Sequence, residues 1–254
     1  MARTLTLVLA SLLLSLGAYA VEYADLLRRA DSLVSFLEND FSAEYTFVQD
    51  IPGEGRSVTK AAVFRRDGEA KYVIIVLEPS VNRGQGYLKV DETLWFYDPY
   101  SRRYNTSSAK DRFQNSNARN SDFTQSTLAQ DYRVVSGSEE RLGRFDCWLL
   151  ELRATTDEVA YPKMKLWISK DGLVRKYEDY SLSGRLLRTT AVPAYTRVGE
   201  RYVPQKLLIV DALRGAEIDG RFRYEQTQIS IAKPSLKTLP DSVFSKSFLE
   251  SVSR

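Results

Sequence analysis

Apolar and polar residues alternate at every second position through much of this chain, which is the pattern of half-buried β-strands. The alternation predicts about eleven antiparallel strands, between residues 41 and 97 and again between residues 132 and 231. Turn dipeptides separate them, among them Asp67-Gly68, Asp171-Gly172 and Arg214-Gly215. A sheet of that many strands must curl or close, so we expect a mainly β fold built on an incomplete barrel.

Two segments follow a helical period instead. Apolar residues recur at steps of three and four over residues 22–39, which predicts an amphipathic helix wide enough to lie against the sheet. The chain closes with a second predicted helix, capped by Asp241 and carrying Val243, Phe244, Phe248 and Leu249. We expect the curled sheet to wrap around the first helix.

Residues 105–131 break the run of strands and are read as a flap. Residues 105–120 are rich in Ser, Asn, Lys and Arg, with Phe113 as the one large apolar residue. Ser121-Asp122 is a suitable N-cap for a short helix over residues 123–131. A polar loop of this length inside a compact domain is usually functional or mobile.

Residues 1–20 have the features of a secretory signal peptide. Arg3 precedes an apolar run of about a dozen residues, and Ala18-Tyr19-Ala20 supplies the small-residue cleavage pattern. We expect cleavage after Ala20, export, and a mature chain of one domain over residues 21–254. An uncleaved N-terminal anchor is the alternative, although the run is short for a membrane span of ~30 Å.

Composition removes several classes of chemistry. The chain has no His and one Cys, which excludes Ser-His-Asp and Cys-His nucleophile pairs, His-based zinc sites, intramolecular disulfides and thiolate clusters. The net charge of +3 comes without a long basic block, so nucleic acid is not expected as a partner. Cys147 lies in an apolar segment, and we expect it to be buried rather than a reactive thiol. Catalytic residues, a metal and a cofactor are not predicted.

Four motifs, in the right order, resemble the LolA-like family of periplasmic outer-membrane lipoprotein-sorting proteins. They cover most of the chain: Gly84–Val90 leading into Thr93–Tyr104; Ser121-Asp122-Phe123 with Leu128, Asp131 and Tyr132; Tyr161–Ile168 continuing through Asp171-Gly172 to Lys176–Tyr180; and Pro240–Leu249.

The resemblance implies an unclosed antiparallel barrel around a helix, with a hydrophobic cavity under a helical lid. It also implies a periplasmic carrier for the acyl chains of lipoproteins, or for a phospholipid or fatty acid. Relatives take cargo from an inner-membrane ABC release complex and deliver it to an outer-membrane acceptor, so we expect comparable partners here and a monomer. The family brings no catalytic motif.

The expected cavity or lid residues are large apolar side chains on the predicted strands and flap: Trp95, Tyr97, Phe123, Leu128, Trp148, Leu150, Met164, Leu166 and Ile168. Plain core packing is the alternative for each of them. Period alone cannot say whether Trp95 and Tyr97 or their neighbours Leu94 and Phe96 face inward.

Basic residues around the flap are expected to contact an anionic headgroup or an acidic partner, namely Arg102, Arg103 and Arg112. The alternative is a solvated loop, since scattered charges in a loop usually are no more than that. Two functions of different classes remain, a lipid or lipoprotein carrier and a periplasmic sensory or interaction module with the same fold. A surface adhesin and a carboxylate-only hydrolase are weaker alternatives.

Overall fold

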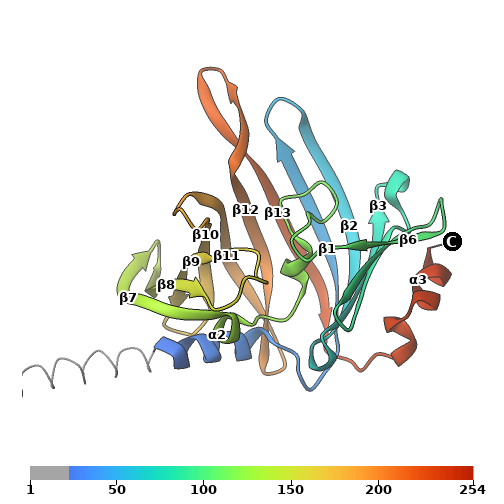
Figure 1. Cartoon of the computed structure of the whole chain (residues 1–254), viewed down its shortest axis with the longest axis horizontal. Helices are drawn as coiled ribbons and strands as arrows, with labels where there is room; N and C mark the ends of the chain where they lie inside the picture. The colour runs from blue at the N-terminus through green and yellow to red at the C-terminus, as the bar shows by residue number, and fades with distance from the viewer. Residues whose placement is uncertain (1–22, 254) are drawn as a thin grey trace, which may run out of the picture.

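The computed structural model describes residues 23–253 and contains one antiparallel sheet of thirteen strands that does not close (Figure 1). The strands are β1 (Phe41–Ile51), β2 (Gly55–Arg66), β3 (Lys71–Glu78), β4 (Gly86–Val90), β5 (Thr93–Asp98), β6 (Arg103–Ser107), β7 (Tyr132–Leu142), β8 (Phe145–Ala154), β9 (Lys163–Ser169), β10 (Val174–Tyr180), β11 (Leu186–Val198), β12 (Arg201–Ile218) and β13 (Arg221–Ser235). The predicted fold, a curled and incomplete antiparallel barrel, is confirmed.

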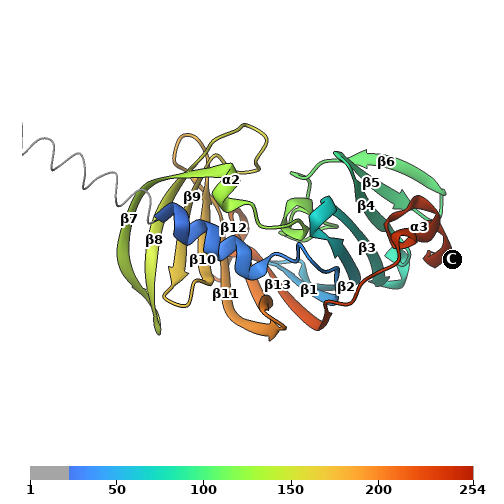
Figure 2. The ribbon, with the colours of Figure 1, turned by 90° about the horizontal axis from the view of Figure 1, so that it is seen from below.

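The sheet consists of two meanders joined side by side. Its order is β6-β5-β4-β3-β2-β1-β13-β12-β11-β10-β9-β8-β7, so the pairing of β1 with β13 unites the two halves. The two edge strands, β6 and β7, are consecutive in the chain. The segment between them therefore crosses the concave side of the sheet from one edge to the other, as Figure 2 shows.

The concave side holds two apolar clusters. Residues 23–34 form the N-terminal helix, which packs Leu27 and Ala30 against β8 and β9. A larger cluster lies over β1–β5, β12 and β13, and Phe113 and Phe123 of the flap are part of it. Both phenylalanines are buried, so the flap contributes to the core instead of only covering it.

A third apolar cluster covers the opposite face of β3–β6. Here the chain ends in η4 (Asp241–Phe244) and α3 (Lys246–Val252), which place Val243, Phe244 and Leu249 on the sheet. Ser245, not Asp241, caps α3 by accepting a hydrogen bond from the Phe248 backbone N–H. The sheet is therefore covered on its concave side by the first helix and the flap, and on its convex side by the last helix.

Four boundaries differ from the sequence predictions. The first helix ends at residue 34 rather than 39. The flap begins after an additional edge strand, β6, and its predicted helix over 123–131 is two single turns, η3 (Asn120–Phe123) and α2 (Leu128–Asp131). Strand β12 passes straight through Arg214-Gly215 and turns at Asp219-Gly220, because a bulge between Val210 and Gly215 absorbs the glycine within the ladder.

Cys147 is 1% exposed, which confirms the expectation that it is buried, and burial raises the pKa of its thiol. No helix within residues 23–253 is both long enough and apolar enough to span a bilayer. The predicted signal peptide at residues 1–20 lies outside the described part of the chain.

Candidate functional site

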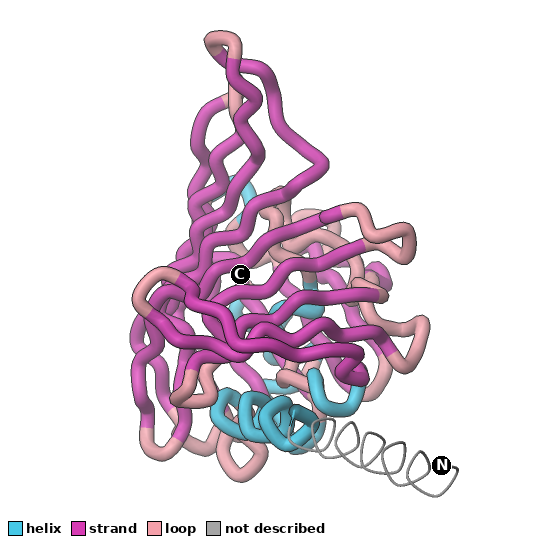
Figure 3. Tube along the Cα trace, turned by 90° about the vertical axis from the view of Figure 1, so that its left-hand side faces the viewer, coloured by secondary structure: helices cyan, strands magenta, loops and turns pink. Residues whose placement is uncertain are grey.

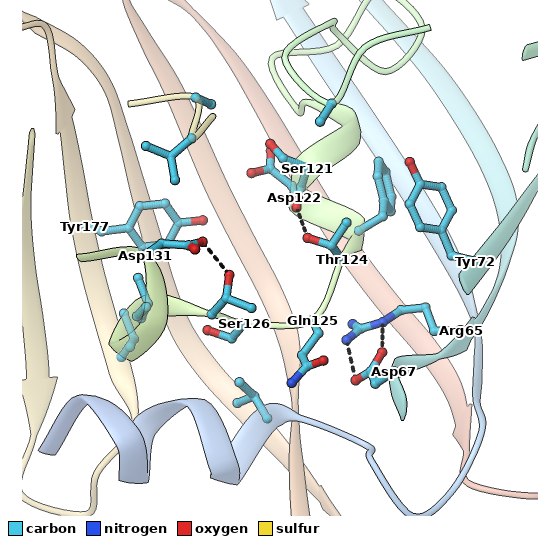
Figure 4. A pocket seen from close by; sticks show the side chains of 18 of the residues that line it. Arg65, Asp67, Tyr72, Ser121, Asp122, Thr124, Gln125, Ser126, Asp131 and Tyr177 are labelled. Carbon is cyan, nitrogen blue, oxygen red and sulfur yellow. Dashed lines mark hydrogen bonds and ion pairs between the residues drawn. The ribbon is translucent and has the colours of Figure 1, made fainter. Parts of the chain in front are cut away.

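A cavity of about 680 Å³ lies between the sheet, the N-terminal helix and the flap. Its apolar wall comes from both halves of the sheet and from the helix, chiefly Val34, Phe41, Val203, Leu207, Ile209 and Ile229. Ligand pockets commonly measure about 300–1,000 Å³ and combine apolar walls with a few polar groups. The flap residues Ser121–Asp131 cross the cavity, as Figure 4 shows.

One end of the cavity carries a buried ion cluster centred on Arg188 of β11. The guanidinium donates to Asp179 Oδ2 at 2.8 Å and to both carboxylate oxygens of Asp122, at 2.7 and 3.1 Å. Asp179 belongs to the wall strand β10, whereas Asp122 belongs to the flap. Arg188 therefore joins the flap to the wall. The rings of Tyr161 and Tyr177 flank its guanidinium.

Burial dominates the electrostatics of this cluster. It raises the pKa of the Asp179 carboxyl to about 6, although Arg188 pulls in the opposite direction. Burial alone disfavours a charged guanidinium, yet the two carboxylates raise the pKa of Arg188 well above its usual value. One oxygen of Asp179, Oδ1, has no hydrogen-bond partner among the described residues. Asp179 is thus the member of the cluster whose charged form is the least well stabilised.

A second polar pair lies at the other end of the cavity, beyond Gln125 in Figure 4. Arg65 donates to both carboxylate oxygens of Asp67, at 3.0 and 2.8 Å, and Asp67 also accepts the Phe36 backbone N–H. The neighbouring Tyr45 hydroxyl is fully desolvated, which raises its pKa to about 12. The cavity therefore combines an apolar wall from the sheet with polar groups at the Arg188 cluster, at the Arg65–Asp67 pair and along the flap.

Three sets of polar contacts tie the flap down. Asp31 of the N-terminal helix accepts hydrogen bonds from the Ser126 hydroxyl and from the backbone N–H groups of Leu128 and Ala129. It therefore acts as a cap for α2, and burial raises the pKa of its carboxyl. Arg112 pairs with Asp211 of β12 and lies 3.6 Å from Glu225 of β13. Together with Asp122 and Arg188, these contacts anchor the flap to the helix and to three strands.

Three of the predicted cavity residues line the cavity. Met164 of β9, Phe123 of η3 and Leu128 of α2 all border it. Phe123 is also packed edge to face against Phe113, with ring centroids 4.9 Å apart. Whether these side chains touch a ligand stays a prediction.

Trp95 and Tyr97 do not line the cavity, which corrects the expectation for them. Both point to the convex face of β5, where η4 and α3 cover them. Lys246 Nζ lies 3.7 Å from the centre of the Trp95 ring. Their neighbours Leu94 and Phe96 belong to the concave cluster instead. The alternation identified two faces correctly but carried no information on which one the closing helix would cover.

The remaining apolar predictions belong to the contact between sheet and first helix. Leu150, Leu166 and Ile168 are buried beneath Leu27 and Ala30, outside the cavity lining. Trp148 lies farther out, edge to face with Tyr23 at 6.0 Å between ring centroids. These side chains hold the helix in place, which was the alternative left open for them.

The predicted headgroup arginines lie in three different settings. Arg102 sits in the exposed turn after β5 with a φ of +54°, and Arg103 is exposed at the start of β6. Neither borders the cavity, and Arg112 is occupied by its carboxylate partners. The arginines that do border it, Arg65 and Arg188, were missed. They sit in ordinary alternating strands, and only the tertiary pairing with Asp67, Asp122 and Asp179 distinguishes them.

Solved structures of three other proteins share this fold. A LolA superfamily protein from Nitrosomonas europaea is 24% identical and superposes with a TM-score of 0.73, covering 88% of this chain and 97% of that one. A domain assigned as an outer membrane lipoprotein-sorting protein from Vibrio parahaemolyticus is 17% identical, with a TM-score of 0.76 and coverages of 89% and 97%. A DUF1329 family protein from Desulfovibrio piger is 19% identical, with a TM-score of 0.78 and coverages of 91% and 98%.

Comparison with curated proteins gives no match. A family model described as "Uncharacterized protein" matches residues 68–251, which begin in the turn between β2 and β3 and reach into α3. The matched segment therefore holds most of the sheet, the whole flap and both sides of the Arg188 cluster. The chain belongs to this family, and its fold is that of the LolA superfamily.

Proposed function

We propose that this protein is a periplasmic carrier that holds the acyl chains of a lipoprotein or lipid in its cavity on the way to the outer membrane. The observation that carries the proposal is the apolar cavity of about 680 Å³ beneath a tethered flap. An acyl chain gains about 0.8 kcal/mol for each CH₂ group removed from water, so such a wall supplies the drive for binding. The polar groups that share this cavity with the apolar wall suit an amphiphile better than a pure hydrocarbon.

Two neighbouring leucines of β12 allow a matched test. Leu207 lines the cavity, whereas Leu208 is 39% exposed on the other face of the same strand. We expect Leu207→Trp to fill part of the cavity and to weaken binding of a fluorescent fatty-acyl probe about tenfold, the equivalent of roughly two CH₂ groups. Leu208→Trp, the control, should stay within a factor of two.

Native mass spectrometry of the mature protein, alongside solvent extraction, identifies the cargo class directly. A bound acylated species at one per chain supports the carrier. An unloaded protein that also fails to take up the probe would overturn it. That result would favour the alternative function, an interaction module, in which the two flap phenylalanines serve only to fill the interior.

A further inference from the structure

A two-stranded extension rises beyond the rest of the sheet. Strand β13 leaves β1 after the pair Asp50↔Gln226, and β12 leaves β11 after Arg188↔Asp211. Farther out, the described ladder joins β12 and β13 only to each other, from Gly215↔Tyr224 to Ile218↔Arg221. Figures 1 and 3 show that this hairpin is the farthest projection of the sheet, on the side away from the N-terminal helix.

The two faces of the extension differ in chemistry. Side chains of β13 alternate, and Thr227 and Ile229 point inward, so Arg221 and Arg223 share the inner face while Phe222 and Tyr224 share the outer one. The two aromatic rings pack edge to face with centroids 5.0 Å apart, and they are 56% and 49% exposed. Exposed apolar patches on a protein surface commonly mark a site of interaction with another protein or a membrane.

Gly215 shapes the aromatic face. It stands opposite Tyr224, and a Cβ at this position would collide first with the Arg223 backbone carbonyl oxygen and would also lie 2.8 Å from the Phe222 ring. Leu213, which is 45% exposed, lies just before it. The strand thus leaves room for the aromatic pair to lie across the hairpin.

The arginines of the extension have no acidic partner. Arg214, Arg221 and Arg223 are exposed, and none forms an ion pair within the described residues. The carboxylates at the base of the hairpin, Asp211 and Glu225, are already paired with Arg112. The extension itself holds only Glu217 and Asp219 against the three arginines.

We propose that the tip of this hairpin docks on an anionic phospholipid bilayer. Tyr224 has a polar end that favours the headgroup level, Phe222 can enter the apolar boundary below it, and arginines reach phosphate groups with their long stems. Each arginine near an anionic surface contributes about a fivefold gain in partition. The extension is two strands wide in the ladder and exposes arginines on one face and aromatic rings on the other, which suits entry of its tip among lipid headgroups better than a flat protein contact. This surface is separate from the cavity, and the proposal does not depend on the cargo.

Flotation with phosphatidylcholine vesicles, with and without phosphatidylglycerol, tests the proposal. The full mature protein should bind only the anionic vesicles, and high salt should release it. At low salt we expect Arg221→Gln/Arg223→Gln to weaken binding about tenfold or more, and Phe222→Ser/Tyr224→Ser to do so in the same range. Glu217→Gln should tighten binding, because it removes a carboxylate beside Phe222.

Controls with the same chemistry lie on distant strands. Arg133 and Arg153 are exposed, face each other across β7 and β8, and form no ion pair within the described residues. Val81 is 67% exposed at η2 (Ser80–Asn82). Arg133→Gln/Arg153→Gln and Val81→Ser should bind vesicles like the parent protein. Equal loss in these variants, or no binding by the parent protein, would overturn the proposal. Retained acyl-probe binding in the hairpin variants would separate this result from a failure of the carrier function.

Discussion

Arg188 connects the buried polar groups of the cavity. It is 6% exposed and bridges a wall strand and the flap with three hydrogen bonds. Two carboxylates share this one guanidinium, and only Asp122 is partly exposed, at 19% of its side chain. Asp179 is fully buried, so its negative charge, which Arg188 balances only in part, is the more expensive of the two to desolvate.

The stability of the protein should therefore depend on Asp179 and pH. Its folded pKa of about 6 exceeds the ordinary value, so its contribution is fully present below about pH 4 and is lost as the pH rises through 6. Asp179→Asn does not titrate. Relative to the parent protein, this variant should gain on the order of 3 kcal/mol between pH 4 and pH 8, two pKa units at about 1.4 kcal/mol each.

Urea denaturation at these two pH values measures the difference. Asp122→Asn provides the comparison. It leaves Asp179 buried but removes a carboxylate that also raises the pKa of Asp179, so it should keep part of the loss of stability with rising pH. A parallel pH dependence of Asp179→Asn and the parent protein would show that folding does not raise the pKa of the buried carboxyl.

At the scale of elements, the last helix depends on a missing side chain. A Cβ on Gly86 of β4 would lie 2.2 Å from Leu249 Cδ1 and 3.1 Å from the Ile74 carbonyl oxygen. Leu249 is completely buried and anchors α3 on the convex face. The glycine is thus required by the close approach of this helix.

Gly86→Ala should push α3 off the sheet and cost about 1–3 kcal/mol of unfolding free energy. Leu249→Ala should cost about 2–5 kcal/mol by leaving a cavity. In the double variant the methyl group introduced at position 86 occupies space that the Leu249 side chain vacated. Adding Gly86→Ala to Leu249→Ala should therefore lower the unfolding free energy by almost nothing more. Additive costs in denaturant unfolding would show that the glycine serves another purpose.

The elements also mark how far the sequence could lead. Alternation located the strands within a few residues, because one face of each strand is buried. It ended β12 at Arg214-Gly215, since the local turn signal is the same whether or not a bulge keeps the glycine in the ladder. It could not place Trp95 and Tyr97, because the helix that covers them lies about 150 residues farther along the chain. The pairing of Arg188 with the flap depends on the same kind of distant contact.

At the scale of the whole molecule, the junction of β1 with β13 decides whether the two meanders behave as one unit. Eight residue pairs join β1 to β13, and within the described sheet no other strand pairing connects the two meanders. Residues from both sides of this junction meet in the larger concave cluster, Phe47 with Ile229 among them. We therefore expect the predicted single domain over residues 21–254 to unfold in one step.

The tryptophans report on each half separately. Trp95 lies in the first meander, and Trp148 and Trp167 lie in the second. Urea transitions of Trp148→Phe/Trp167→Phe and of Trp95→Phe, each compared with its own far-ultraviolet circular dichroism, should have fluorescence and dichroism midpoints that coincide. Separate midpoints within one variant would indicate two independently folding halves.

The open seam between β6 and β7 gives the molecule a form of elasticity. A closed barrel fixes its girth by its strand number and stagger, and widening it breaks ladder hydrogen bonds. Here the ladder has two ends, and the contents are enclosed by a segment of chain stretched between them. A bulkier occupant strains that segment and its attachments at Asp31, Arg112 and Arg188, while the backbone pairing of all thirteen strands stays intact.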